Sequence, residues 1–258
     1  MNDLERFFNN NTHGTLFKWH HYFEIYDRHL SHLRGTEVHI LEFGIFQGGS
    51  LRMWKDYFGP QCKVYGVDIN EHCIKLTEDQ VEIFIGDQND RTFLKSLIDK
   101  IPQIDVLIDD GGHRMQEQIN TFEVLFDHID QNGIFICEDL HTSYWGKYGG
   151  GYKASNSFIE YSKNLIDKIH AWHSKTDELP ISKFTKTAKS LHYYDSILVI
   201  EKSTVEKPSS SRTGQDLIPT YKKPKLIHST TKKNNKLLSL TKSFIKQCLK
   251  LFRQNNSN

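Results

Sequence analysis

Short apolar runs alternate with amphipathic segments from residue 38 onward, and this alternation indicates an α/β protein. The apolar runs are rich in Val, Ile and Phe, as is typical of parallel strands buried on both faces. We therefore expect a Rossmann-like, doubly wound, mostly parallel seven-stranded sheet. Five strands are predicted at 38–44, 63–69, 81–87, 104–110 and 133–139, helices at 49–58, 91–101, 116–129 and 156–173, and a closing antiparallel hairpin within 189–202.

The segment before the sheet, residues 14–33, is rich in aromatic and His residues at helical spacing. One interpretation is a helix that packs Phe17, Phe23 and Ile25 onto the sheet, and the other is a lid over an active site. The remaining chain divides by composition. The predicted units are a helical lid at 1–36, the α/β domain at 37–202, a flexible Ser-, Pro- and Lys-rich linker at 203–235 and a basic amphipathic helix at 236–253.

Charge is distributed unevenly along the 258 residues, although the net charge is only +1. Residues 1–216 carry 23 Lys and Arg against 32 Asp and Glu, whereas residues 217–258 carry ten basic residues and no acidic one. The basic tail is interpreted either as a helix that docks on an anionic membrane surface or as a solvated extension. The acidic body and the lack of a nucleic-acid-binding motif argue against a nucleic acid partner.

Targeting signals are absent from the pattern. The four cysteines form no C-x-x-C pair, and the N-terminus lacks the basic start and apolar stretch of a signal peptide. No apolar run approaches the roughly 20 residues of a membrane-spanning helix. We expect a cytoplasmic protein, held at the inner face of the cytoplasmic membrane if the tail docks there. The sequence leaves open whether the chain forms a homo-oligomer.

The first predicted strand runs into a glycine-rich turn, "LEFGIFQGGS", which contains Glu42, Gly44, Gly48 and Gly49. Glycines at a strand-to-helix turn let backbone N–H groups approach a ligand closely. Such a turn alone is weak evidence, because several nucleotide-binding folds have one. We treat these four residues as candidates for cofactor binding.

The next two predicted strands also end in polar residues. Asp68 ends the second strand, where a carboxylate can accept hydrogen bonds from both hydroxyls of a ribose. Asp87 and Gln88 end the third, where an acid and an amide could hydrogen-bond the edge of an adenine. Ligands of open α/β sheets bind at the carboxyl ends of the strands. Three consecutive strand ends therefore predict a nucleoside-containing cofactor.

Acidic residues follow the last two parallel strands. The stretch "LIDDGGH" supplies Asp110, and Glu138 and Asp139 follow 28 residues later. Adjacent strands lie about 4.8 Å apart, so these carboxylates can converge on a hard cation such as Mg²⁺. His113, with an ordinary pKa of about 6.5, is the candidate base, unless it is a solvated loop or helix-cap residue. Asp109 either shares the metal or positions the cofactor.

The glycine-rich turn has the form E-x-G-x-x-x-G and resembles that of class I S-adenosylmethionine (SAM)-dependent methyltransferases more than that of NAD-binding folds. "LIDDGGH" and "ICEDLHTSYW" resemble the metal-dependent sugar O-methyltransferases of macrolide biosynthesis, of the mycinamicin and demethylmacrocin type. More distant relatives are cephalosporin-hydroxylase-like proteins and rhamnosyl O-methyltransferases. The resemblance implies SAM and Mg²⁺ as cofactors, with the metal on Asp110, Glu138 and Asp139 and with His113 and Asp110 as catalytic residues.

The N-terminal "KWHHYFEIYDRHL" resembles the segment with which this family closes over its cofactor, and this likeness implies a cofactor contact for Tyr22 together with His21 and Tyr26.

The loop at 141–153, "HTSYWGKYGGGYK", directly follows the acid pair. Tyr144 and Trp145 could stack on a sugar ring, and His141 lies beside them in the chain, so we take all three as candidate substrate residues. The glycines in the same loop are equally consistent with a plain flexible connection.

These features predict a SAM-dependent, Mg²⁺-dependent O-methyltransferase that acts on a sugar hydroxyl of a glycan, glycolipid or glycosylated metabolite. One alternative is an NAD-dependent oxidoreductase of sugars, which would leave the acidic cluster unexplained. An oxygenase would need a two-histidine, one-carboxylate iron site, which the pattern does not show. A non-catalytic SAM-binding module tethered by its tail is the third alternative.

Overall fold

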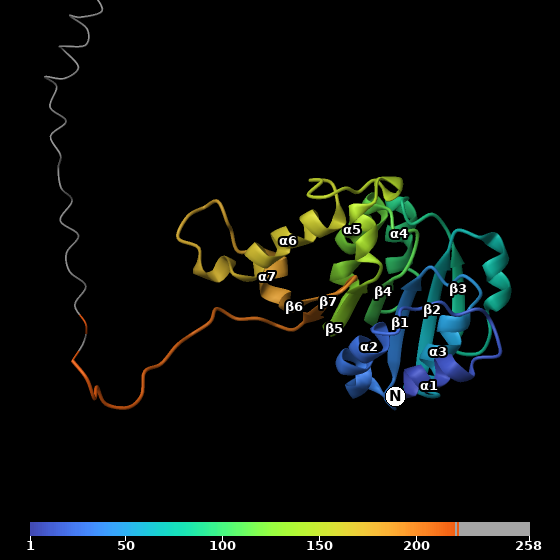
Figure 1. The fold of residues 1–258 in the computed structure, drawn as a ribbon, viewed down its shortest axis with the longest axis horizontal. Helices are drawn as coiled ribbons and strands as arrows, with labels where there is room; N and C mark the ends of the chain where they lie inside the picture. Colours follow the sequence, from blue (N-terminus) through green and yellow to red (C-terminus); the bar gives the residue numbers. More distant parts are fainter. Residues whose placement is uncertain (220, 222–258) are drawn as a thin grey trace, which may run out of the picture. The chain divides into compact units, whose positions relative to one another are not determined.

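The computed structural model describes residues 1–219 and residue 221. Residues 1–209 form one compact unit around a seven-stranded sheet of order β3-β2-β1-β4-β5-β7-β6 (Figure 1). This confirms the predicted sheet and its closing hairpin. The strands are β1 (Val38–Phe43), β2 (Cys62–Asp68), β3 (Val81–Ile85), β4 (Ile104–Asp109), β5 (Ile129–Cys137), β6 (Ala188–Tyr194) and β7 (Ile197–Lys202).

The strand register brings four strand ends to one edge of the sheet. β1 pairs in parallel with β2 and with β4, and β4 pairs in parallel with β5. Phe43, the last residue of β1, lies opposite both Val67 and Asp109, and Asp109 lies opposite Cys137. The strand order reverses between β1 and β4, where doubly wound sheets open a crevice for ligands. β7 and β6 add antiparallel pairs to β5.

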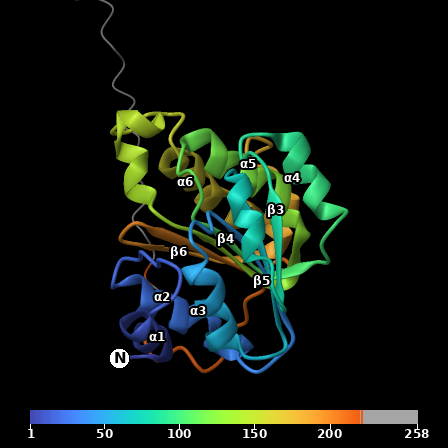
Figure 2. The same ribbon diagram turned by 90° about the vertical axis from the view of Figure 1, so that its right-hand side faces the viewer.

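Helices cover both faces of the sheet, as Figures 1 and 2 show. Strand side chains alternate between the two layers, because successive residues of a strand point to opposite faces. Ile40 packs with the first layer and Leu41 with the second. The first layer holds α1 (Asp3–Asn10), α2 (Tyr22–Leu30) and α3 (Gly49–Phe58), and the second holds α4 (Arg91–Ile98), α5 (Met115–Leu125), α6 (Phe158–Ile169) and α7 (Lys183–Thr187).

The N-terminal segment differs from the single helix predicted at 14–33. α1, which was not anticipated, begins with a capping box between Asn2 and Glu5. Residues 14–19 form no helix, and α2 starts only at Tyr22. Phe23 and Ile25 are buried as expected, but Phe17 is 78% exposed. For Phe17 the helix interpretation was wrong, because residues 15–19 form no helix and the chain there packs against the glycine-rich turn.

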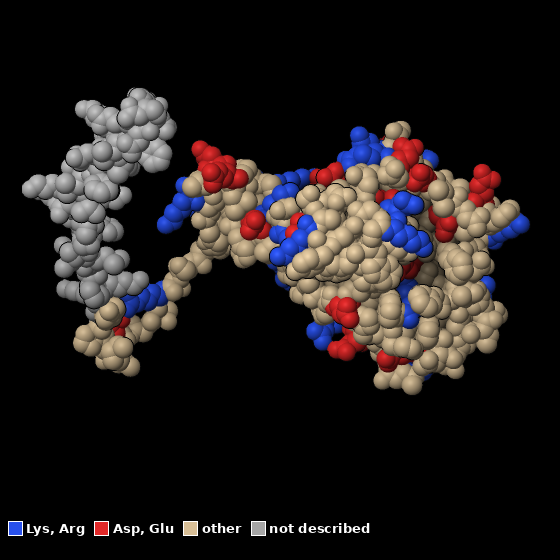
Figure 3. All heavy atoms as spheres, turned by 45° about the horizontal axis from the view of Figure 1, so that its top comes forward, with Lys and Arg blue, Asp and Glu red and all other residues tan. Residues whose placement is uncertain are grey.

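The predicted linker and basic helix follow the last strand of the sheet. Residues 203–219 form no helix or strand, and the predicted helix at 236–253 lies outside the described residues. Among the described residues, no helix is long and apolar enough to cross a membrane. Acidic and basic side chains of the body are interspersed over the face shown in Figure 3, so its charges form no single-sign patch there.

Gly44 provides a test of how tightly the strand ends are packed. Its φ is +82°, and a Cβ there would lie 2.0 Å from the backbone oxygen of Asp110. Gly35 has a similar φ of +72° but open space around it, so it is the matched control. In urea unfolding we expect Gly44→Ala to lose at least ~2 kcal/mol more stability than Gly35→Ala, because only Gly44→Ala adds a backbone clash to the strain. Equal losses would contradict the close packing of β1 on β4.

Candidate active site at the carboxyl edge of the sheet

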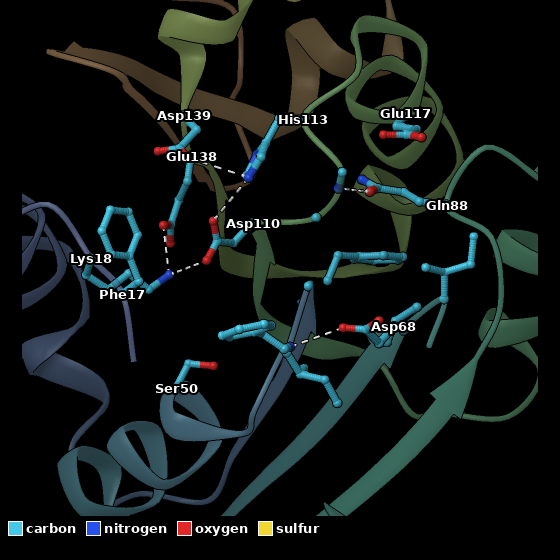
Figure 4. Close-up of a pocket in the computed structure, with 18 of the residues that line it drawn as sticks. Phe17, Lys18, Ser50, Asp68, Gln88, Asp110, His113, Glu117, Glu138 and Asp139 are labelled. Atoms are coloured by element: carbon cyan, nitrogen blue, oxygen red, sulfur yellow. Dashed lines mark hydrogen bonds and ion pairs between the residues drawn. The ribbon is translucent and has the colours of Figure 1, made fainter. Parts of the chain in front are cut away.

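A cavity of about 560 Å³ opens at the carboxyl ends of β1 to β5. Figure 4 shows its polar side chains converging from these strand ends and from the N-terminal segment. The structure therefore brings most of the sequence-predicted site residues to one place. From that set the lining includes Gly44, Asp68, Asp87, Gln88, Asp110, His113, Glu138, Asp139 and Tyr22; residues 15–19, Ser50 and Glu117 also line the cavity.

Asp68 is held in place by the backbone of the neighbouring turns. Its Oδ2 accepts a hydrogen bond from the Phe46 N–H at 3.1 Å, and its Oδ1 accepts one from the Asn70 N–H at 2.9 Å. Phe46 and Ile69 flank it along the cavity wall and are 60% and 70% exposed. A carboxylate between two exposed apolar side chains suits a ligand that combines hydroxyl groups with a flat ring.

Glu42, Gly48 and Gly49 do not line the cavity, in contrast to their predicted contact with the cofactor. Glu42 is fully buried and accepts hydrogen bonds from Ser50 Oγ at 2.7 Å and Trp54 Nε1 at 3.1 Å. Burial raises the pKa of Glu42 to about 6. Because Ser50 does line the cavity, Glu42 acts through it, by fixing the first turn of α3.

Gly49 serves the packing of the N-terminal segment, whereas Gly48 serves the turn into α3. A Cβ on Gly49 would lie 2.7 Å from the backbone oxygen of Gly14, and a Cβ on Gly14 would lie 2.3 Å from that of Gln47. Gly48 has a φ of +75° and precedes the first residue of α3. Gly14 and Gly49 thus let backbone pack directly on backbone, and residues 15–19 that follow line the cavity.

The Gln88 amide is occupied by other protein groups rather than being free to bind an adenine. Its Nε2 donates to Asp109 Oδ1 at 2.7 Å and to Thr121 Oγ1 at 2.9 Å, and its Oε1 accepts from the Gly112 N–H at 3.2 Å. Asp109 is fully buried, outside the cavity lining, and burial raises its pKa to about 6. Gln88 and Asp109 therefore shape the loop that carries His113, and of the predicted pair only Asp87 is left to face a base.

Sequence reasoning missed Lys18, which lies at the centre of the acidic cluster. Its Nζ is 2.6 Å from Asp110 Oδ2 and 2.8 Å from Glu138 Oε2, and its side chain is 2% exposed (Figure 4). Glu138 Oε1 accepts a hydrogen bond from the Tyr26 hydroxyl at 2.6 Å. Both oxygens of Glu138 are thus bonded within the protein, whereas Asp110 keeps Oδ1 toward the cavity.

Asp139 and His113 face each other across the cavity floor. His113 Nε2 lies 3.6 Å from Asp139 Oδ2 and 3.8 Å from Asp110 Oδ1. Both His113 and Asp139 have positive φ values, 56° and 53°, which is a costly backbone conformation that proteins retain mainly at functional sites. The Tyr22 hydroxyl donates to Asp139 Oδ1 at 2.9 Å and so fixes this carboxylate.

The cluster has unusual proton affinities. Burial raises the pKa of Asp110 and of Glu138 to about 7 each, although the Lys18 ammonium opposes the rise in both. In turn, the carboxylates of Asp110 and Glu138 raise the pKa of Lys18 well above its usual range, against the effect of its burial. Lys18 is therefore a permanent cation, and the charge of the two acids depends on it.

The three predicted substrate residues lie beside the main cavity instead of lining it. His141 Nδ1 bonds Ser196 Oγ at 2.5 Å, and His141 and Tyr144 line a second cavity of about 380 Å³. The Trp145 ring lies 4.7 Å from that of His141, which in turn lies 5.7 Å from the ring of Trp19. Since Trp19 lines the main cavity, this aromatic cluster adjoins its wall, and contact with substrate stays a prediction.

Other proteins of known activity resemble this chain. No family model matches it. It is 34% identical over 196 residues to the 8-demethyl-8-alpha-L-rhamnosyl tetracenomycin-C 2'-O-methyltransferase of Streptomyces olivaceus, covering 72% of this chain and 51% of that protein. It is 32% identical over 207 residues to the mycinamicin VI 2''-O-methyltransferase of Micromonospora griseorubida, covering 76% and 49%.

Among solved structures, the MycE methyltransferase of the mycinamycin biosynthetic pathway, in complex with Mg, SAH and mycinamycin VI, superposes with a TM-score of 0.72 at 30% identity, over 79% of this chain and 54% of that one.

The chain is a homologue of sugar O-methyltransferases. This confirms the resemblance drawn from the glycine-rich turn and the acidic motifs. This chain spans about half the length of the curated relatives it matches.

Replacing Lys18 of this methyltransferase homologue tests the charge balance of the cluster. We expect Lys18→Met to lose ~3–5 kcal/mol of stability at pH 8, because the buried Glu138 carboxylate and the partly buried Asp110 carboxylate lose their counter-charge. The pKa values of Asp110 and Glu138, already raised to about 7, would rise further above their unfolded values near 4. Between these pKa values the folded variant binds more protons than the unfolded chain, so a lower pH favours the folded state. The stability lost relative to the wild type therefore shrinks as the pH falls toward 5.

Urea unfolding at pH 5 and pH 8 checks this. Lys183→Met, which removes an exposed ion pair with Asp127 at 2.9 Å, is the control and should cost no more than ~1 kcal/mol. A deficit for Lys18→Met that is independent of pH would contradict the pairing.

Proposed function

We propose that this protein is a SAM-dependent, Mg²⁺-dependent O-methyltransferase that transfers a methyl group to a sugar hydroxyl. The observation that carries the proposal is the convergence of Asp110, His113 and Asp139 on one wall of a cavity whose other wall holds Gly44 and Asp68. Homology to sugar O-methyltransferases supports it over the nicotinamide-dependent alternative.

The acidic wall fits a divalent cation. Asp110, His113 and Asp139 bring one donor atom each within 4.8 Å of one another, and the two carboxylates would hold the cation while His113 Nε2 stays unligated as the base. Asp110 and Asp139 supply the hard oxygen donors that Mg²⁺ prefers. Glu138, the third predicted ligand, reaches a cation only if Lys18 or Tyr26 releases one of its oxygens. Bound Mg²⁺ would supply Lewis-acid chemistry by lowering the pKa of a coordinated sugar hydroxyl.

Side chains of the protein would bind SAM, orient the acceptor and accept its proton. Asp68 receives the ribose hydroxyls of SAM, and Asp110 and Asp139 orient the acceptor. His113 Nε2 accepts the proton of the sugar hydroxyl as its oxygen attacks the sulfonium methyl group, and S-adenosylhomocysteine leaves. The Tyr22 hydroxyl, bonded to Asp139, keeps that carboxylate turned toward His113. Residues 15–19 close one side of the cavity and help to exclude water.

Calorimetric titration of SAM into the full chain, with NAD⁺ as the comparison ligand, tests the cofactor. We expect saturable SAM binding and none for NAD⁺. Asp68→Asn should weaken SAM binding, because it replaces the carboxylate that accepts the ribose hydroxyls. Binding of NAD⁺ in place of SAM would overturn the proposal that the protein is a methyltransferase.

Transfer of labelled methyl groups to glycosylated acceptors tests the base. His113→Ala should lower the rate about 10²- to 10⁴-fold, which is the usual contribution of general base catalysis, while SAM binding is retained. The exposed His72 is the matched control, and His72→Ala should leave both unchanged. Wild-type rates in His113→Ala would assign the proton transfer to another group.

A finer proposal concerns the setting of the reaction. The basic tail at 217–258 would hold the enzyme at an anionic membrane, near a surface polysaccharide or glycolipid acceptor. In flotation with phosphatidylglycerol vesicles, the full chain should bind and a chain ending at residue 205 should not. Vesicles of phosphatidylcholine are the control, because the tail's attraction is electrostatic. Equal binding by the two chains would exclude the tail as the anchor.

A further inference from the structure

A second group of metal-ligating side chains lies between α2 and the β6–β7 hairpin. It consists of His29 from α2, His192 from β6 and Glu201 from β7. Ser190 pairs with Glu201 across the hairpin, and His192 lies two residues farther along β6. Since alternate residues of a strand share a face, Ser190 and His192 point the same way, toward α2. None of these residues lines the active-site cavity.

The spacing of the donor atoms suits one small cation. Glu201 Oε1 lies 2.9 Å from His29 Nδ1 and 3.7 Å from His192 Nε2, and the two imidazole centroids are 4.7 Å apart. A tetrahedral zinc ion with bonds of about 2.0–2.1 Å holds its ligand atoms roughly 3.3 Å apart. The observed separations bracket that value, so small side-chain shifts would complete the geometry.

Outer hydrogen bonds orient two of these donors. His29 Nε2 lies 2.9 Å from the Tyr194 hydroxyl, and Glu201 Oε2 accepts a hydrogen bond from Ser190 Oγ at 3.1 Å. Protein metal sites hold their ligands with such outer hydrogen bonds. His192 differs, because its Nε2 lies 2.9 Å from Ser190 Oγ, a hydrogen bond that a metal would replace. His29 Nδ1 donates to Glu201 Oε1 at 2.9 Å, and a bound metal would displace this proton. The Tyr194 oxygen can accept as well as donate, so it could then accept a hydrogen bond from His29 Nε2.

The group of His29, His192 and Glu201 is open to solvent on one side. The side chain of His29 is only 3% exposed, whereas those of His192 and Glu201 are 35% and 28% exposed. Burial also lowers the pKa of His29, which favours the neutral imidazole that binds metals. Among the described residues, Lys189 also forms an ion pair with Glu201, with its Nζ 3.7 Å from Oε2 and its side chain 63% exposed. Lys189 is free to swing into solvent when a metal arrives.

We propose that His29, His192 and Glu201 form a second divalent-metal site, suited to Zn²⁺ with a water molecule in the fourth position. Two imidazoles and one carboxylate match the preference of Zn²⁺, whereas Mg²⁺ prefers oxygen ligands alone. The site would tie α2 to the closing hairpin, and α2 also carries Tyr22 and Tyr26 to the acidic cluster. This assignment does not depend on the methyltransferase activity.

Titration of Zn²⁺ into the tag-free full chain tests the site, with excess Mg²⁺ present to load the acidic cluster. We expect one saturable zinc site, and Co²⁺ in its place should give the intense visible absorption of four-coordinate cobalt. His192→Gln and, separately, Glu201→Gln should weaken zinc binding by more than the roughly 10- to 100-fold that loss of an outer partner costs. Zinc should raise the melting temperature of the wild type far more than that of either variant.

Two matched variants complete the test. His32 is an exposed histidine one helical turn beyond His29, and His32→Gln should bind zinc like the wild type. Asp139→Asn should also retain the site, which separates it from the acidic cluster. Two separate ligand variants are used in case one of them does not fold, and circular dichroism without metal checks the folding of both. Zinc affinity unchanged in both ligand variants, or no saturable zinc binding to the wild type, would overturn the site.

Discussion

The contact between the Lys18 ammonium and the carboxylates of Asp110 and Glu138 organises the candidate active site at the carboxyl edge of the sheet. It joins three distant parts of the chain, since Lys18 precedes its two partners by 92 and 120 residues. The buried Glu138 and the partly buried Asp110, which follow adjacent strands, would otherwise repel each other. The same contact holds the segment at 15–19, and with it Phe17 and Trp19, on the cavity wall.

The positions of the strand ends could be predicted from the sequence because they depend on local patterns. Runs such as "VLIDD" identify both a buried strand and the polar residues at its end, and parallel pairing then brings these ends together. Asp68, Asp110 and Asp139 were found in this way, and each lines the cavity. The prediction succeeded where one strand and its last residues contained the information.

The partner of each side chain was harder to predict, because partners depend on packing between distant segments. Glu42 follows the expected motif but turns into the core toward Trp54, and Gln88 turns toward Asp109. The one available signal for Lys18 was its place as the only charged residue in the aromatic run "FKWHHYF". A lone lysine between Phe17 and Trp19 has to find either solvent or a buried acid, and the sequence does not say which.

The turn of the β6–β7 hairpin has a consequence for how distant substitutions act. The backbone oxygen of Ser196 in that turn lies 3.1 Å from the Tyr22 hydroxyl, and its Oγ bonds His141. Tyr22 begins α2, and His29 lies seven residues later, about 10 Å along the same rigid helix. The hairpin therefore contacts α2 near both ends of the helix, and the Tyr22 hydroxyl connects α2 to Asp139. A substitution in the last two strands that moves α2 is therefore expected to move the Tyr22 hydroxyl and, with it, the Asp139 carboxylate.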